Sequence, residues 1–87
     1  MELVEIRNIT RKDAPVLYRR SFNGEAVVKY DEATVRAWRI AFVLEHTPTD
    51  GVQVQAEFVD QPDYPLVPAI RMVKDYVLQL DKKGMLP

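Results

Sequence analysis

Apolar and polar residues alternate along two neighbouring stretches of the chain, residues 38–44 and 52–58. In the second stretch every other residue from Val52 to Phe58 is apolar and the residues between them are polar, which is the period of a half-buried β-strand. The two stretches are separated by residues 47–51, whose sequence TPTDG is rich in turn-forming residues. This pattern predicts a β-hairpin with one apolar face.

The segment between Asp31 and His46 fits two secondary structures. As a helix, it would be capped by Asp31. As a strand, it has an apolar face from Trp38 to Leu44 that matches the face across the hairpin, whereas a helix would leave the second strand of the hairpin unpaired. The strand is therefore the better interpretation, although it is unusually long unless it bends near its start. We predict strands over about 34–46 and 52–60, with a bend or bulge at 31–35.

The N-terminal third of the chain contains three shorter stretches with strand patterns. In the first, Val4 and Ile6 share one face and charged residues occupy the other. A polar connection that ends in Pro15 separates the first stretch from the second. Between the second and the third stands Asn23-Gly24, a dipeptide typical of tight hairpin turns because both residues tolerate positive φ. We predict strands over about 2–9, 15–22 and 25–30, joined as a meander.

Three prolines between residues 62 and 68 end the strand patterns. Proline is tolerated in the first turn of a helix, and an amphipathic pattern follows directly. Apolar residues recur there at steps of three and four, at positions 66, 69, 70, 73, 77 and 80. Gly84 comes next and can adopt the left-handed conformation that ends a helix. The pattern predicts a helix over about 66–82.

These elements predict one domain over residues 1–87 in the α+β class. It is a two-layer sandwich in which an antiparallel meander sheet of four to five strands is covered on one face by the C-terminal helix. A length of 87 residues is enough for a single core, and 47% hydrophobic with 29% charged residues is the composition of an ordinary globular protein. We expect the chain to fold without a cofactor.

The residue types that most catalytic sites require are scarce. The chain has no cysteine, which excludes disulfides, thiolate metal sites and a cysteine nucleophile. His46 is the only histidine, so no second imidazole is available to complete a metal site with it. The three glycines are isolated and form no phosphate-binding loop. We therefore predict no catalytic residues and no metal site, and expect that the protein is not an enzyme.

Basic residues concentrate between positions 7 and 20, although the net charge of the whole chain is −1. This stretch lies next to Tyr18 and Phe22, and basic residues interleaved with aromatic ones can bind the backbone and bases of a single-stranded nucleic acid. The other interpretation is a charged strand that protects a sheet edge from aggregation. The residues concerned are Arg7, Arg11, Lys12, Arg19 and Arg20.

The second face of the strand over 34–46 is more apolar than an exposed face requires. A contiguous apolar patch of this kind is typical of a partner surface or of the contact between two identical chains. We therefore predict a small protein-interaction or self-association module that docks through the outer sheet face or an open edge strand, and a nucleic-acid-binding domain is the alternative. The residues of the predicted interaction surface are Arg39, Ala41, Val43 and Val59.

The N-terminus carries acidic residues where a signal peptide needs basic ones, and no apolar run approaches the length of a membrane span. We therefore expect a cytoplasmic location and no membrane partner.

Overall fold

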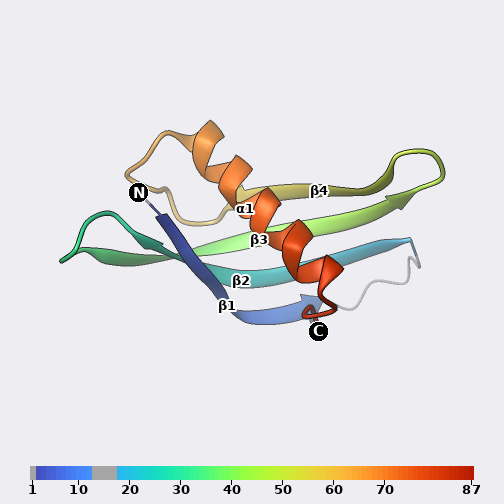
Figure 1. Ribbon diagram of the computed structural model, residues 1–87, viewed down its shortest axis with the longest axis horizontal. Helices are drawn as coiled ribbons and strands as arrows, with labels where there is room; N and C mark the ends of the chain where they lie inside the picture. Colours follow the sequence, from blue (N-terminus) through green and yellow to red (C-terminus); the bar gives the residue numbers. More distant parts are fainter. Residues whose placement is uncertain (1, 13–17) are drawn as a thin grey trace.

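The computed structural model describes residues 2–12 and 18–87, and it consists of one antiparallel sheet and one helix (Figure 1). The strands follow one another in the sheet in the order of the sequence, and the sheet is open. The α+β meander with a C-terminal helix is thereby confirmed. The elements are β1 (Glu2–Lys12), β2 (Arg19–Lys29), β3 (Val35–Thr47), β4 (Gly51–Phe58) and α1 (Leu66–Lys82).

The predicted hairpin is formed by β3 and β4, so the strand interpretation of this segment is confirmed. The bend expected before the strand is the turn between β2 and β3, where the Tyr30 N–H donates to the Thr34 carbonyl oxygen (2.9 Å). The register aligns the apolar residues of the two hairpin strands on one face. It pairs Ile40 with Phe58, Phe42 with Ala56, and Leu44 with Val54.

The predicted turn at Asn23-Gly24 is wrong, because β2 runs through both residues without a break. The strands predicted over 15–22 and 25–30 are therefore one strand, and residues 15–17 of the first lie outside the described residues. A Cβ at Gly24 would lie 3.3 Å from Cγ2 of Ile6 and 3.4 Å from Cγ1 of Ile9. Glycine is present here because the neighbouring strand approaches closely, not because the chain turns.

That close approach comes from a bulge in β1, whose register shifts between Arg7 and Thr10. Asn8 inside this bulge has a φ of 52°, a left-handed conformation that asparagine tolerates better than most residues. Beyond the bulge β1 continues to Lys12, which is further than the predicted end near residue 9.

The helix α1 packs on one face of the sheet and crosses its strands from the β4 side to the β1 side (Figure 1). The Met85 N–H donates to the Leu80 carbonyl (2.9 Å), and the N–H of Gly84, at φ 66°, donates to the Asp81 carbonyl (3.0 Å). These two bonds form a Schellman cap, which confirms the predicted helix end. The core between helix and sheet consists of Ile6, Phe22, Ala26, Ile40, Phe42, Leu44, Val54, Val73 and Val77.

The packing at Gly24 can be tested with Gly24→Val. Overpacking costs about 1–3 kcal/mol, whereas the preference of valine for strands returns at most ~1 kcal/mol. We expect a net loss of about 1 kcal/mol or more in the free energy of unfolding, measured by denaturant titration. Gly24→Ala should lose less, because the ends of Ile6 and Ile9 need to move only slightly. A Gly24→Val protein as stable as the wild type would contradict this account of the glycine.

Candidate protein-interaction surface

The sheet has a helix-free face, the one opposite α1, and within the described residues no other helix or strand covers it. Residues of β3 alternate between the two faces, and Ile40 and Phe42 are buried on the helix side. Arg39, Ala41 and Val43 therefore lie together on the helix-free face. Val59 is exposed beside them, and its N–H donates to the Arg39 carbonyl oxygen (2.9 Å).

The middle of the helix-free face carries no charge. Ala41 and Val43 are half-buried there, and the register places Asn23 opposite Ala41 and both Ser21 and Gln55 opposite Val43. A shallow depression over β3 and β4 is lined in part by these side chains. We call this set the neutral centre: Ser21, Asn23, Ala41, Val43 and Gln55.

Arg39 stands at the rim of the neutral centre and forms an ion pair with Asp60. Its Nη2 lies 2.7 Å and its Nε 3.1 Å from Oδ1 of Asp60, while the Arg39 backbone N–H donates to Oδ2 (2.9 Å). The hydrogen bonds from the Arg39 side chain and backbone lower the pKa of the Asp60 carboxyl, and the same pair raises the pKa of Arg39. Arg39 is therefore held in place and neutralised by its own chain.

Other charges around the neutral centre are also matched by opposite charges. Arg7 Nε lies 3.4 Å from Oε1 of Glu25, and the Asn8 side-chain amide donates to the same oxygen. Arg19 stands opposite Glu45 in the register of β2 and β3. The helix-free face thus has an uncharged middle and a rim of opposite charges.

The five basic residues between positions 7 and 20 do not share one surface. By register, Arg7, Lys12 and Arg19 lie on the helix-free face, while Arg11 is paired with the buried Phe22 and so faces the helix side. Phe22 is completely buried and cannot stack on a base.

Arg20 also faces the helix side, where it joins the sheet to the end of α1. Its Nη1 donates to Oδ1 of Asp81 (3.0 Å) and its Nη2 donates to Nε2 of His46 (3.0 Å). A carboxylate near a helix C-terminus is unfavourable on its own, and the Arg20 charge offsets this. Arg20 therefore has a structural role, and His46 has a partner from the same chain.

Sequence reasoning missed the polar half of the neutral centre and both of these ion pairs. Asn23 was assigned to a turn and so was not placed on a face. The Arg39 and Asp60 contact was accessible from the hairpin register, since pairing Ile40 with Phe58 brings Asp60 close to Arg39. The Arg20 and Asp81 contact joins residues 61 positions apart, and no local pattern indicates it.

The described residues contain no group of three or more histidine, cysteine, aspartate or glutamate side chains placed to hold a metal ion. The helix found in the same part of the chain is too short and too polar to cross a membrane.

Residues 1–82 of the chain match the model of one protein family, and the chain therefore belongs to that family. The family is described by a locus label alone, which names no reaction and no ligand. No curated protein and no solved structure was found to match the chain.

The Arg39 and Asp60 ion pair predicts a pH dependence of stability. Because the folded pKa of Asp60 lies below its usual value of 3.8, the pair stabilises the fold above that pH, and this stabilisation is lost as the pH falls through the folded pKa. In Asp60→Asn it is absent, so the difference in Tm from the wild type should be constant between about pH 7 and pH 5 and shrink below about pH 4. Asp50→Asn, in the exposed hairpin turn, is the control; a pH-independent difference for Asp60→Asn would contradict the prediction.

The Arg20 and Asp81 contact should contribute to stability, since both side chains are only about one-fifth exposed (20% and 22%). Loss of a hydrogen bond to a charged group costs about 1.5–3 kcal/mol, so Arg20→Ala should lower the free energy of unfolding by about that much. In a double-mutant cycle with Asp81→Ala, we expect a coupling energy of about 1 kcal/mol. Additive effects of the two substitutions would show that the contact contributes nothing.

Proposed function

We propose that this family member is a small cytosolic protein-interaction module that binds another protein through its helix-free sheet face. One observation carries the proposal: an uncharged centre surrounded by charges that the chain itself already pairs. Protein interfaces have this arrangement, with few charged residues in the buried core and a polar rim.

Binding at this face carries a small desolvation cost. Covering the neutral centre removes Ala41 and Val43 from water, and no charge is buried with them. The hydroxyl of Ser21 and the amides of Asn23 and Gln55 can form hydrogen bonds with a partner backbone. The matched partner surface is therefore flat and uncharged in its middle.

The neutral centre is smaller than a complete interface. A standard interface uses about 20–30 residues on each side, so the rim has to take part. The rim carries alternating charges, which favour one orientation of a partner and contribute more to specificity and association rate than to affinity.

Nucleic-acid binding is the weaker alternative. It requires basic and aromatic side chains on one surface, whereas Arg11 and Arg20 face the helix side and Phe22 is buried. No specific observation favours this function over protein binding.

The proposal is tested by capture from a native extract with tagged wild-type and Val43→Asp proteins. The aspartate places a charge in the neutral centre, so we expect recovery of the partner to fall at least tenfold, which corresponds to about 1.4 kcal/mol. Val4→Asp is the matched control, because Val4 is exposed on the edge strand β1. Circular dichroism and thermal unfolding establish first that both variants are folded.

Nuclease treatment of half of each extract separates the two functions. A partner protein that is lost with Val43→Asp, kept with Val4→Asp and unaffected by nuclease supports the proposal. Equal recovery with both variants contradicts it, and material that disappears with nuclease indicates the nucleic-acid function instead.

A further inference from the structure

The two edges of the sheet differ in their ability to accept another strand. The β1 edge has register shifts between Leu3 and Glu5 and between Arg7 and Thr10, and Asn8 is left-handed. Bulges and charged side chains are the features that prevent edge-to-edge pairing. The charged residues of β1 are Glu2, Glu5, Arg7, Arg11 and Lys12.

The β4 edge has none of these features. Its register with β3 is unbroken from Gly51 to Phe58, its sequence GVQVQAEF contains no proline, and Glu57 is its only charged residue. Such a strand is a ready template for pairing with another chain.

The direction of the free backbone groups on β4 follows from one hydrogen bond. The Val59 N–H points toward β3, where it donates to the Arg39 carbonyl. Alternate residues of an antiparallel strand turn their backbone groups to the same side, so residues 52, 54, 56 and 58 direct theirs away from β3. These four residues present donors and acceptors at the open edge.

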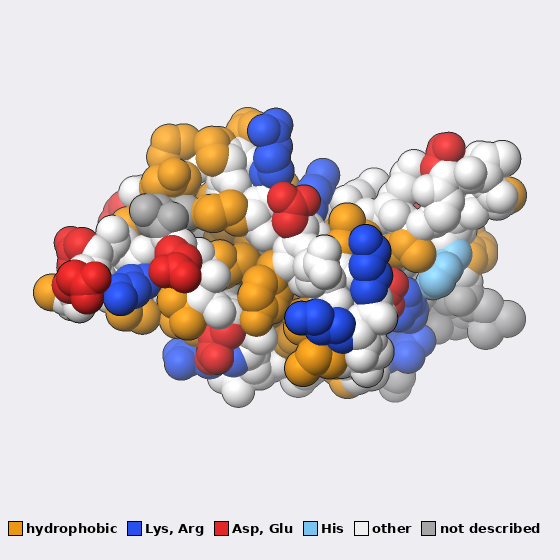
Figure 2. Space-filling view, viewed as in Figure 1, with side chains coloured by type: hydrophobic (Ala, Val, Ile, Leu, Met, Phe, Trp, Pro, Cys, Tyr) orange, Lys and Arg blue, Asp and Glu red, His pale blue; other side chains and the backbone are white. Residues whose placement is uncertain are grey.

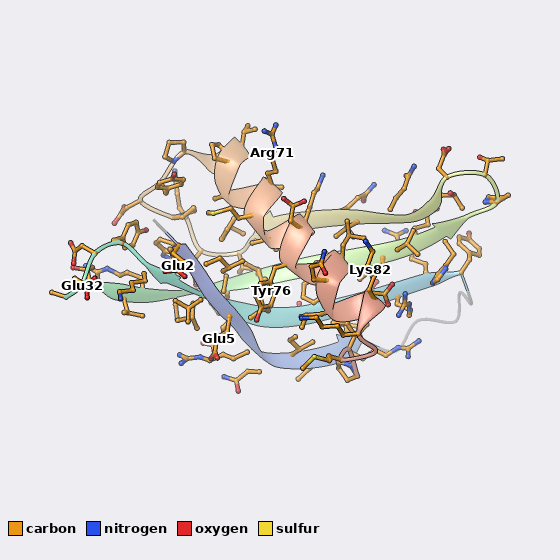
Figure 3. All side chains as sticks on the ribbon, in the orientation of Figure 1. Glu2, Glu5, Glu32, Arg71, Tyr76 and Lys82 are labelled. Atoms are coloured by element: carbon orange, nitrogen blue, oxygen red, sulfur yellow. The ribbon has the colours of Figure 1, made fainter. Side chains whose placement is uncertain are left out.

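The first half of α1 extends beyond this edge. Figure 3 shows Arg71 pointing outward on the β4 side of the helix, while Tyr76 points toward β1. Leu66 and Val67 near the helix start are 52% and 67% exposed, and Val67 and Ile70 line a shallow hollow on the flank with Arg71. In Figure 2 hydrophobic side chains gather at this end of α1. A strand added to β4 would lie under this part of the helix.

We propose that the added strand is β4 of a second copy of this chain, paired antiparallel about a two-fold axis at Gln55. Gln55 is the midpoint of the backbone ladder that runs from Gly51 to Val59. The outward backbone groups then meet one another, because each even-numbered residue of β4 faces an even-numbered residue of the second copy. The register pairs residue 54 with 56 and residue 52 with 58.

The side chains of β4 are self-complementary in this arrangement. An isologous contact places every residue pair twice. Gln55 meets Gln55 of the second copy and Gln53 meets Glu57 of the second copy, so that no carboxylate faces another carboxylate. A self-pairing centred on Glu57 would oppose two carboxylates, which disfavours it.

The two-fold arrangement also covers the exposed start of α1. Phe58 lies opposite Val52 of the second copy, so the helix that follows β4 extends over the hairpin of that copy. Each hairpin tip projects beyond its own α1 (Figure 1), and on its helix side His46 is exposed and Val52 is half-buried. Leu66 and Val67 thereby gain an apolar neighbour. The helix-free faces stay open, and the inference does not depend on the proposed function.

Sedimentation of the full chain from micromolar to millimolar concentration tests the dimer. Gln55→Lys and Gln55→Glu each place like charges on the axis and should weaken dimerisation about fivefold or more. An equimolar mixture of the two variants places opposite charges there and should associate more tightly than either variant alone. Gln55 is exposed on the helix-free face, so neither substitution disturbs the core.

Gln79→Lys, on an exposed position of α1, is the matched control and should dimerise as the wild type does. A wild-type chain that stays monomeric over the whole range overturns the inference. So does a dimer that both Gln55 variants leave unchanged, or a mixture that associates no better than the separate variants.

Discussion

The stacking of Phe22 on Phe42 is the contact on which the rest of the structure depends. Their ring centroids are 5.2 Å apart, and both side chains are essentially inaccessible to solvent in the middle of the core under α1. The pair fixes the register between β2 and β3. A slip of one residue would turn every side chain of a strand to the opposite face, so this register decides which residues meet the helix and which remain on the helix-free face.

One helix on a four-stranded sheet leaves the second face without a covering element. The chain fills this face with residues that tolerate water and cost little to dehydrate, namely small, hydroxyl and amide side chains in the middle. The charges are placed outside them and paired, most closely in the Arg39 and Asp60 contact at 2.7 Å. A face built in this way is stable when exposed and is also suited to being covered, which is why it supports an interaction role better than a purely charged face would.

The hairpin of β3 and β4 and the helix were predictable because each depends on a period that the sequence shows directly. The error at Gly24 arose because the sequence shows a glycine but not the chain that passes it. Asn23-Gly24 has the composition of a turn, yet the flanking residues Phe22 and Ala26 form one alternating apolar row that continues through it. The role of Arg20 was equally inaccessible, since its partner Asp81 reaches it only after the helix has folded back over the sheet.

Gly24 links the fold to the way in which the sheet can grow. Because it has no side chain, β1 can approach closely and form the bulge that contains the left-handed Asn8. That bulge makes β1 a poor template for another strand, whereas β4 is regular and remains available. In the proposed dimer the two-fold axis uses both β4 edges, and only the two irregular β1 edges are left at the ends of the enlarged sheet. Association through β4 therefore closes at two copies, and the sheet does not extend into a fibre.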